Sequence, residues 1–399
     1  MSEWQKVRFL DVVHLNPRIS LEKGVEYPFV EMSNVVPCAR KPEKDVFKKY
    51  LGGGTKFEQG DTIVARIEPC LQNGKGFQCS YKQGFGSTEF LVFRPVNIND
   101  LDCDFLYYYM GQQSIREAMA KTMVGASGRQ RVNNKVFNDL QINLPPLQTQ
   151  HRIATILSRY DSLIENYQKQ IKLLEEAAQR LYKEWFIDLR FPGHENTKIV
   201  DGVPEGWEIK SITNNHLFDV AKCRIALFNG NKTYYATADV EGTYFCNSGV
   251  KIEYDNKPSR AQIQPSLYSV WFARMSNSFK IVGFVEQNNN RREDSILSSG
   301  FAGFESHYER FGFLYCLISS QWFNDQKDRY ATGATQVSIT NEGLSRIRCL
   351  LPTTRLAEEF SLVTNKIIEE TILYRENCTM LTEARDRLLP KLMSGEIEI

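Results

Sequence analysis

Side chains able to carry out catalysis are scattered along this sequence and form no complete motif. Asp201, followed by Glu208 and Lys210, supplies the carboxylates and lysine of a metal-dependent nuclease, but the set lies beside Pro204 and Gly206 at the start of a domain. The five histidines stand singly, without the H-E-x-x-H spacing of a zinc site. The sequence therefore favours a chain that binds and orients other molecules, with a nuclease as one alternative.

Nucleotide and methyl-transfer motifs are also missing. The run from Gly52 to Lys56 is rich in glycine but lacks the order of a P-loop, so we interpret it as a flexible turn. The run from Asn16 to Ile19 only begins like the Asn-Pro-Pro-aromatic motif of amino-methyltransferases. The nine cysteines never have C-x-x-C spacing, which is typical of reduced thiols in a cytosolic protein. We expect no catalytic residue, metal site or cofactor in this chain.

Length and composition indicate a soluble protein of two or more domains. A chain of 399 residues is too long for one ordinary core, and 42% hydrophobic with 24% charged residues is typical of well-packed proteins. No apolar stretch reaches the roughly 18 residues of a membrane span, and no secretory signal pattern opens the chain. We expect a cytoplasmic protein that has no membrane partner. The net charge of +1 means that DNA binding would need locally concentrated basic residues or basic partners.

The chain repeats itself at a nearly fixed spacing. Leu144-Pro145 and Leu351-Pro352 are 207 residues apart, and Phe105-Leu106-Tyr107 matches Phe313-Leu314-Tyr315 at 208. The 207-residue spacing also relates identical pairs further along: Tyr167 and Tyr374, Leu174 and Leu381, Glu176 and Glu383, Ala177 and Ala384, Arg180 and Arg387, Leu181 and Leu388. We therefore predict two copies of one unit, each a globular domain followed by a helix.

Each copy ends in a long stretch whose apolar residues recur at alternating steps of three and four, as in a coiled coil. Pro145 and Pro146 mark the start of the first stretch, and Phe191-Pro192-Gly193 marks its end. Its predicted seam is Ile153, Leu157, Tyr160, Ile164, Tyr167, Ile171, Leu174, Ala178, Leu181 and Trp185. The second stretch has Phe360, Ile367, Tyr374, Leu381, Leu388 and Leu392 at equivalent positions. Its alternate positions are the poorer Thr364, Thr371, Cys378 and Arg385, for which Val363 and Ala384 could in part substitute.

The strict 3.5-residue period favours pairing of the two helices with each other. The alternative is that each helix packs on its own globular domain, which usually gives a broader stripe at 3.6. A helix of about 36 residues is roughly 54 Å long at 1.5 Å per residue, and one turn of DNA is about 34 Å. A paired coil of this length could hold two domains far enough apart to contact separated half-sites.

The globular parts, residues 1–147 and 200–350, have the pattern of mixed α/β domains with many short strands. We expect strands at 61–66, 88–93 and 266–272, and one apolar helical stretch in each part, at 105–121 and 311–329. Neither part shows βαβ alternation, which argues against a Rossmann-type sheet. The predicted fold class is α+β, with two similar mixed α/β domains and two long helices.

Taken together, these residues resemble the specificity subunits of type I restriction–modification systems. Each half opens with a Trp-led segment, at Trp4 and Trp207, and the run from Gly60 to Val64 is similar to the family's Gly-Asp-apolar segment. Each domain ends in a small-residue loop, a short apolar strand and Leu-Pro, as from Gly125 to Leu147 and from Thr332 to Pro352. The resemblance covers the whole chain.

The ends of the two helices add to the resemblance. Trp185-Phe186-Ile187-Asp188 and the C-terminal run from Leu388 to Ile397 are similar to the family's segments. One departure is Pro352-Thr353-Thr354-Arg355, which replaces the Pro-Pro-Leu-x-x-Gln pattern of residues 145–150. We expect Thr353 or Thr354 to cap the second helix instead.

The resemblance implies four parts: target-recognition domain 1 at 1–147, a central helix at 148–190, target-recognition domain 2 at 191–352 and a C-terminal helix at 353–399. Each domain would read one half of an asymmetric bipartite target in double-stranded DNA. The helices would form an antiparallel coiled coil related by a pseudo-twofold axis. Two modification (methyltransferase) subunits would bind this scaffold and carry S-adenosylmethionine, and restriction/translocase subunits would bring the chemistry that depends on ATP and Mg²⁺. This chain would be non-catalytic.

Arg, Asn, Gln and Lys side chains read base edges and grip phosphates, so clusters of them are the candidate DNA contacts. In the first domain these are Arg129, Gln130, Arg131, Asn133, Asn134 and Lys135 in one loop, and Arg66, Gln72, Asn73 and Lys75 in a second patch. In the second domain they are Arg274, Ser276, Asn277 and Lys280, the segment 288–292 with Asn289, Arg291 and Arg292, and Gln336 and Ser338. We read 288–292 as a polar, basic loop.

Two alternatives stand beside the nuclease. The first is a stand-alone DNA-binding or scaffold protein without a modification partner. The second is a coiled-coil structural protein, which would not bind DNA even when partners are present.

Overall fold

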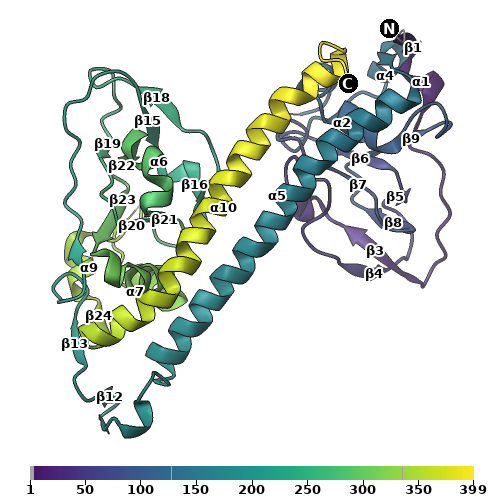
Figure 1. Ribbon diagram of the computed structural model, residues 1–399. Helices are drawn as coiled ribbons and strands as arrows, with labels where there is room; N and C mark the ends of the chain where they lie inside the picture. Colours follow the sequence, from purple (N-terminus) through teal and green to yellow (C-terminus); the bar gives the residue numbers. More distant parts are fainter. Residues whose placement is uncertain (1–3, 127, 335) are drawn as a thin grey trace. The chain divides into compact units, whose positions relative to one another are not determined.

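A computed structural model of the chain describes residues 4–126, 128–334 and 336–399. Ser127 and Thr335, from the two small-residue loops, lie outside the described residues. Contacts divide the chain into two compact units, the first formed by Met1–Glu165 with Met380–Ile399 and the second by Asn166–Thr379. Each unit holds one globular part and one end of each long helix, α5 (Leu147–Tyr182) and α10 (Thr354–Ser394), drawn in teal and yellow in Figure 1.

The first unit is built on two four-stranded sheets. One has the order β2-β9-β6-β7, with β2 Val13–Leu15, β9 Phe90–Pro95, β6 Thr62–Ala65 and β7 Gly76–Gln78. The other has the order β4-β3-β8-β5, with β4 Phe47–Lys49, β3 Glu26–Val30, β8 Gln83–Gly86 and β5 Thr55–Glu58. Of these pairings only β3 with β8 is parallel. The remaining elements are β1 Gln5–Arg8, which pairs with β10 Gln141–Leu144, and α1 Phe9–Val12, α2 Cys103–Gly111, α3 Gln113–Ala120 and α4 Val136–Asp139.

Strand β6 lies at the centre of this unit because both of its faces are covered. All four of its residues are buried. Successive side chains of a strand point to opposite faces, and here Val64 packs in the cluster with α2, whereas Ile63 packs in the cluster with the second sheet. This accounts for the continuous apolar run in the sequence, where a strand covered on one face would alternate.

The second unit repeats both strand orders. Its sheets are β14-β23-β20-β21 and β18-β15-β22-β19, and β15 with β22 is again parallel. The strands are β14 Asp219–Val220, β23 Phe301–Glu305, β20 Ser269–Ala273, β21 Ile281–Phe284, β18 Val250–Ile252, β15 Lys232–Tyr235, β22 Ser295–Ser298 and β19 Ala261–Ile263. Strand β13 Glu208–Ser211 pairs with β24 Arg348–Leu351, as β1 pairs with β10. The predicted internal repeat is therefore present in the topology.

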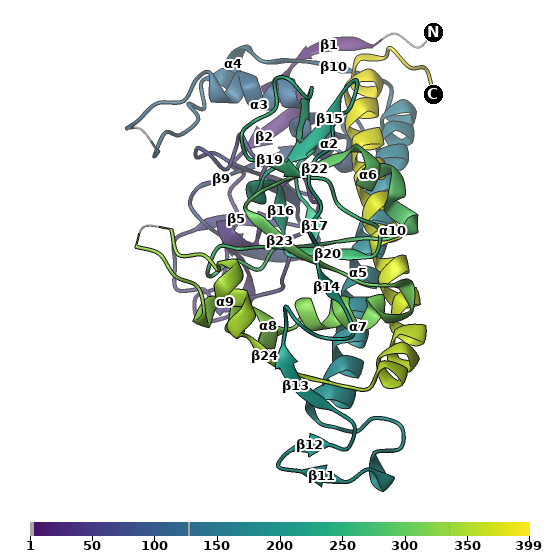
Figure 2. The same cartoon turned by 90° about the vertical axis from the view of Figure 1, so that its left-hand side faces the viewer.

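The second unit also has elements of its own. Two short hairpins are β11 Ile199–Val200 with β12 Val203–Pro204, and β16 Val240–Glu241 with β17 Tyr244–Phe245. Figure 2 shows the first hairpin beyond β13.

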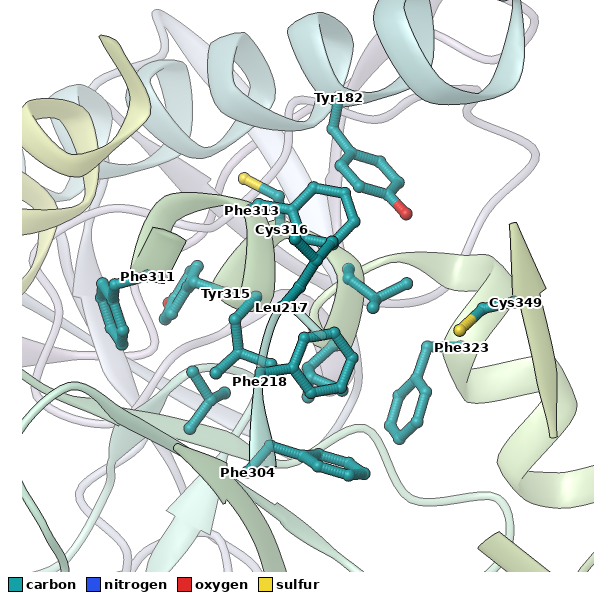
Figure 3. Packing of buried hydrophobic residues seen from close by; sticks show 14 of the residues in the cluster. Tyr182, Leu217, Phe218, Phe304, Phe311, Phe313, Tyr315, Cys316, Phe323 and Cys349 are labelled. Atoms are coloured by element: carbon teal, nitrogen blue, oxygen red, sulfur yellow. The ribbon is translucent and has the colours of Figure 1, made fainter. Parts of the chain in front are cut away.

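Helices α7 Tyr308–Ile318 and α8 Gln321–Arg329 of the second unit correspond to α2 and α3 of the first. The second unit also contains the helices α6 Asn289–Asp294 and α9 Asn341–Arg346. Aromatic side chains from α5, α7 and the sheet fill the core, among them Tyr182, Phe313 and Phe304 (Figure 3).

Three sequence predictions of local structure were wrong. The helical stretch 105–121 is two helices, because Gln112 between them is extended at ψ 140. The stretch 311–329 is also two helices, and the Ser320 side chain caps the second by accepting from Phe323 N. The segment 288–292, expected to be a loop, is helical as the end of a 3₁₀ turn and most of α6. A run of polar residues does not by itself distinguish a short surface helix from a loop.

Helices α5 and α10 contact each other inside each unit. In the second unit the rings of Tyr167 and Tyr374 lie 4.9 Å apart, and those of Tyr182 and Phe360 6.2 Å apart, so the partners run in opposite directions. In the first unit Leu157 and Leu392 belong to one buried cluster. Every predicted seam residue on the two helices is buried or half-buried. Each helix also packs on globular elements. The predicted contact between the two helices and the alternative, in which each helix packs on a globular part, therefore both occur.

One prediction about the alternate seam positions of α10 was wrong. Val363, expected to replace Thr364 in part, is 51% exposed, whereas Thr364 is fully buried. The Thr364 hydroxyl donates to Phe360 O, which satisfies it inside the helix. Thr353 accepts a hydrogen bond from Leu356 N at 3.3 Å, so the predicted threonine cap is present. Within the described residues, no helix has the length and apolar character needed to cross a membrane.

Candidate nucleic acid interface

Two equivalent loops stand at the same place in the two units. In loop 1, residues 124–131, Val124 bridges Arg131, which also bridges Ile67 after strand β6. In loop 2, residues 332–338, Thr332 bridges Ser338, which also bridges Met275 after strand β20. The bridges align Arg131 with Ser338, and hence Arg129 with Gln336 and Gln130 with Val337. The frame is common to both units, while the side chains on it differ.

A glycine turns each loop. Gly125 has φ +129 and Gly333 has φ +136, values that side chains rarely adopt. A Cβ atom at Gly333 would also lie 2.4 Å from the carbonyl oxygen of Gln336, which is closer than van der Waals contact permits. The matched Gly-Ala pairs of the sequence therefore mark a backbone requirement.

An ion pair holds loop 1 in place. Arg131 donates two hydrogen bonds to the Glu89 carboxylate, at 2.6 and 2.8 Å. The Arg131 guanidinium lowers the pKa of Glu89 below its usual value through these bonds. Glu68 N also donates to the Gln130 carbonyl oxygen. Arg131, predicted as a DNA contact, is thus committed in this structure to a carboxylate of its own unit.

Arg66 and Arg274 are equivalent residues, and the side chain of each is directed toward the backbone that follows the loop of its own unit. Arg66 Nη2 donates to Val132 O at 3.4 Å. Arg274 donates to Phe301 O, Ile339 O and the Asn341 side chain at 3.2, 3.1 and 2.8 Å. Burial lowers the pKa of Arg274. These two bracketing arginines hold the residues that follow the loops. Arg66 binds Val132 after loop 1, and Arg274 joins Ile339 and Asn341 after loop 2 to Phe301 of β23.

Other predicted residues are exposed and lie on or beside the loops. Arg129 and Lys135 are exposed in the first unit, and Gln336 is exposed in the second. Gln72 and Asn73 are exposed in the segment after β6, and Gln72 donates to Glu68 at 2.9 Å. The structure places no ion-pair partner on Arg129 among the described residues. These side chains, unlike the two bracketing arginines, are available to a ligand.

Most of the other residues predicted to contact DNA form hydrogen bonds within their own unit. Lys75 Nζ donates to Met32 O at 2.9 Å, and Lys280 Nζ donates to Thr237 O at 2.8 Å. Asn277 donates its backbone N–H to the Asp328 carboxylate, Asn133 accepts from Lys135 N, and Ser276 N donates to Val337 O. The Asn134 side-chain oxygen is buried without a partner in the described structure.

The segment around α6 faces helix α10. Arg291 forms a two-bond ion pair with Glu376, at 2.6 and 2.8 Å, and also donates to the Tyr235 hydroxyl at 3.0 Å. Arg292 donates to Asn289 at 2.8 Å and pairs with Glu293 at 3.1 Å. Arg291 and Arg292, predicted as DNA contacts, are thus paired in this structure with carboxylates of their own unit.

Sequence reasoning missed a buried lysine that supports loop 2. Lys327 on α8 is 2% exposed, and its Nζ donates to Met275 O at 2.8 Å and Ser278 O at 3.1 Å. It also pairs with Asp328 at 2.8 Å. Lysines are almost never fully buried unless paired, so a lysine in a polar helical run gave no signal of this role.

The candidate nuclease residues take part in ordinary surface contacts. Glu208 and Lys210 lie on β13 and pair with each other at 2.6 Å, which lowers the pKa of Glu208. Asp201 lies in the turn between β11 and β12 with φ +53. Across the ranges 4–126, 128–334 and 336–399, no group of His, Cys, Asp and Glu side chains could hold a metal ion.

Comparison with known proteins gives a consistent result. Residues 1–176 match the family described as Type I restriction modification DNA specificity domain. The chain is 27% identical over 315 residues to the type I restriction enzyme MjaIX specificity subunit of Methanocaldococcus jannaschii, covering 74% of this chain and 69% of that protein. It is 22% identical to the HindI specificity subunit of Haemophilus influenzae over the full length of both.

A solved structure has a similar fold. The S subunit of a type I restriction–modification system from M. genitalium aligns with a TM-score of 0.56 and 17% sequence identity, covering 98% of this chain and 96% of that one. This similarity supports the mixed α/β fold with many sheets and helices. The resemblance drawn from the sequence motifs is confirmed.

Proposed function

We propose that this chain is a specificity subunit of a type I restriction–modification enzyme, and that it selects double-stranded DNA by reading one half of a split target with each of its two units. The observation that carries the proposal is the pair of equivalent loops. Their glycines, bridges and bracketing arginines are the same, while Arg129 and Gln130 in loop 1 are replaced by Gln336 and Val337 in loop 2. A shared frame with different exposed side chains is what two different half-sites require.

The chemistry of these side chains gives each loop a preferred base. An arginine in the major groove donates two hydrogen bonds to guanine, and a glutamine pairs with adenine. Valine and the exposed Met275 beside it offer apolar contact to a thymine methyl group. We propose that loop 1 contacts a guanine and that loop 2 contacts an A·T pair.

In this proposal, helices α5 and α10 set the distance between the two reading units. Each unit contains antiparallel contacts between them, and α5 and α10 are 36 and 41 residues long. At 1.5 Å per residue, a helix of 36 residues spans about 54 Å, more than the roughly 34 Å of one DNA turn. An antiparallel coiled coil would therefore separate the two reading units.

Partner subunits would carry out the chemistry. We propose that two modification subunits, which bind S-adenosylmethionine, join this scaffold, and that restriction and translocase subunits dependent on ATP and Mg²⁺ complete the assembly in the cytoplasm. The chain itself would contribute recognition alone.

Substitution of Arg129 tests the loop assignment. In the complex with its modification subunit, Arg129→Ala is expected to lower affinity for the target duplex by about 5- to 100-fold, the range for loss of one bidentate base contact, and to relax selectivity at one position. Fluorescence anisotropy with target and scrambled duplexes measures both. Lys172→Ala, on the exposed side of α5, is the matched control and should leave affinity unchanged. Unchanged affinity and selectivity in Arg129→Ala would remove loop 1 from the interface.

A further inference from the structure

Each unit contains a carboxylate–guanidinium pair between α5 and α10. In the first unit Asp161 and Arg385 lie 2.7 Å apart, and their side chains are only 11% and 10% exposed. In the second unit Glu175 pairs with Arg375, whose side chain is 13% exposed. Both pairs place the acid on α5 and the base on α10.

Each pair also binds the globular part of its own unit. Tyr108 on α2 donates its hydroxyl hydrogen to Asp161, and Arg385 donates to Cys38 O at 3.3 Å. In the second unit, Thr243 in the β16–β17 turn donates to Glu175 at 2.7 Å, and Arg375 donates to the Thr243 carbonyl oxygen. We call the two sets clamp 1 (Asp161, Arg385, Tyr108, Cys38) and clamp 2 (Glu175, Arg375, Thr243). Each clamp joins both helices and one globular part.

The clamps do not belong to the repeat. At the 207-residue spacing, Asp161 corresponds to Ile368, and Arg385 corresponds to Ala178. Ile368 and Ala178 are themselves buried, so the second unit fills the equivalent positions with apolar side chains. Glu175 and Arg375 likewise correspond to Thr382 and Gln168. Each unit therefore has its own clamp at a different place along the helices.

Stability alone is a weak reason for such pairs. Removing two charges from water costs several kcal/mol per ion, and well-packed apolar residues often serve as well or better. A hydrogen-bonded ion pair differs in being directional, because its donors and acceptors meet in one geometry. The contrast between Asp161–Arg385 and the apolar Ile368–Ala178 points to a role in orientation.

The surroundings of clamp 1 strengthen this view. A cavity of about 340 Å³ lies beside it, lined by α2, α3, the β6–β7 strands and α10, with Tyr108, Asp161, Arg385 and Leu389 on its wall. The pocket is partly open to solvent and lies where the globular part meets α10. The clamp supplies directional contacts at that place.

We propose that clamps 1 and 2 fix the orientation of each globular part on the helix pair, and that they thereby set the length of DNA spacer the protein accepts. Asp161, Arg385, Glu175 and Arg375 are positioning residues in this proposal, since they act through the loops and not on DNA. The inference rests on the proposed function, because a spacer exists only for a split target.

The test uses the full chain in complex with its modification subunit. Methyl transfer is measured on duplexes that carry both half-sites and spacers from two base pairs shorter to two longer than the native one. The variant Asp161→Ile with Arg385→Ala installs the apolar pair that the chain uses at Ile368 and Ala178. The ratio of methylation on altered spacers to methylation on the native spacer should rise between about tenfold and 100-fold, the range of rate effects of small misplacements. Arg387→Ala, which removes an exposed arginine on α10, is the control and should keep the wild-type profile.

Other outcomes separate the two claims. An unchanged spacer profile, or a uniform loss on all spacers, overturns the inference while leaving the proposed function standing. A wild-type complex that methylates no split duplex overturns the proposed function, and the inference falls with it. Thermal unfolding confirms that the variant is folded; if it is not, Glu175→Thr with Arg375→Gln repeats the test on clamp 2, with the residues found at Thr382 and Gln168.

Discussion

Neighbouring polar side chains in the loops have opposite roles, and only the structure separates them. Arg129 projects from loop 1, whereas Arg131, two residues along, pairs with Glu89. Arg66 was predicted from sequence as a DNA contact, but its guanidinium donates to the backbone oxygen of Val132, directly after loop 1. Residue type and spacing located the two equivalent loops through their Gly-Ala runs, and the binding of DNA by these loops stays a prediction. They could not predict orientation, because Glu89 lies on a distant segment of the chain.

The Glu89–Arg131 pair predicts a pH dependence. The pKa of Glu89 is lowered in the folded protein by Arg131, so the pair stabilises the fold above the unfolded-state pKa of about 4.3, and its contribution is lost as the pH falls through the folded-state value. Glu89→Gln should therefore be less stable than wild type at pH 7, and the difference should shrink below about pH 4. Denaturant unfolding of both proteins from pH 7 to pH 3 measures this, and a constant difference would exclude the mechanism.

At the scale of elements, the long helices were the most predictable part of the chain. The proline boundaries and the seam residues follow from periodicity, and α5 begins at Leu147, directly after Pro146. The interruptions between α2 and α3 and between α7 and α8 were not visible, because each break occupies only one or two residues. The clamps could not be predicted either, since no sequence pattern aligns Asp161 with Arg385 before the helix register is known.

The packing of α7 on α10 depends on one glycine. A Cβ atom at Gly312 would lie 2.2 Å from the Thr364 hydroxyl and 2.9 Å from the Asn365 side-chain oxygen. Gly312→Ala should therefore lower the free energy of unfolding by about 1–3 kcal/mol, the usual cost of overpacking. Gly111→Ala is the matched control, because nothing lies within 4 Å of its Cβ position in α2. Urea titration compares the two, and equal stability of both variants would contradict the assigned contact.

At the scale of the whole molecule, duplication accounts for both the fold and its use. The two units share strand orders, a parallel pair between equivalent strands and the loop frame, although only scattered identities link their sequences. The repeat was visible where packing constrains the residues, as at Leu144-Pro145 and Leu351-Pro352. It was weak in the globular parts, where different exposed side chains would serve different half-sites.

Mapping the methylated bases tests the central claim most directly. Host DNA lacking this modification would be treated with the modification subunit in the presence and absence of this chain, and every methylated position sequenced. We expect a single two-part motif with unlike halves and a fixed spacer, found only when the chain is present. One uninterrupted motif, or the same methylation without the chain, would contradict it.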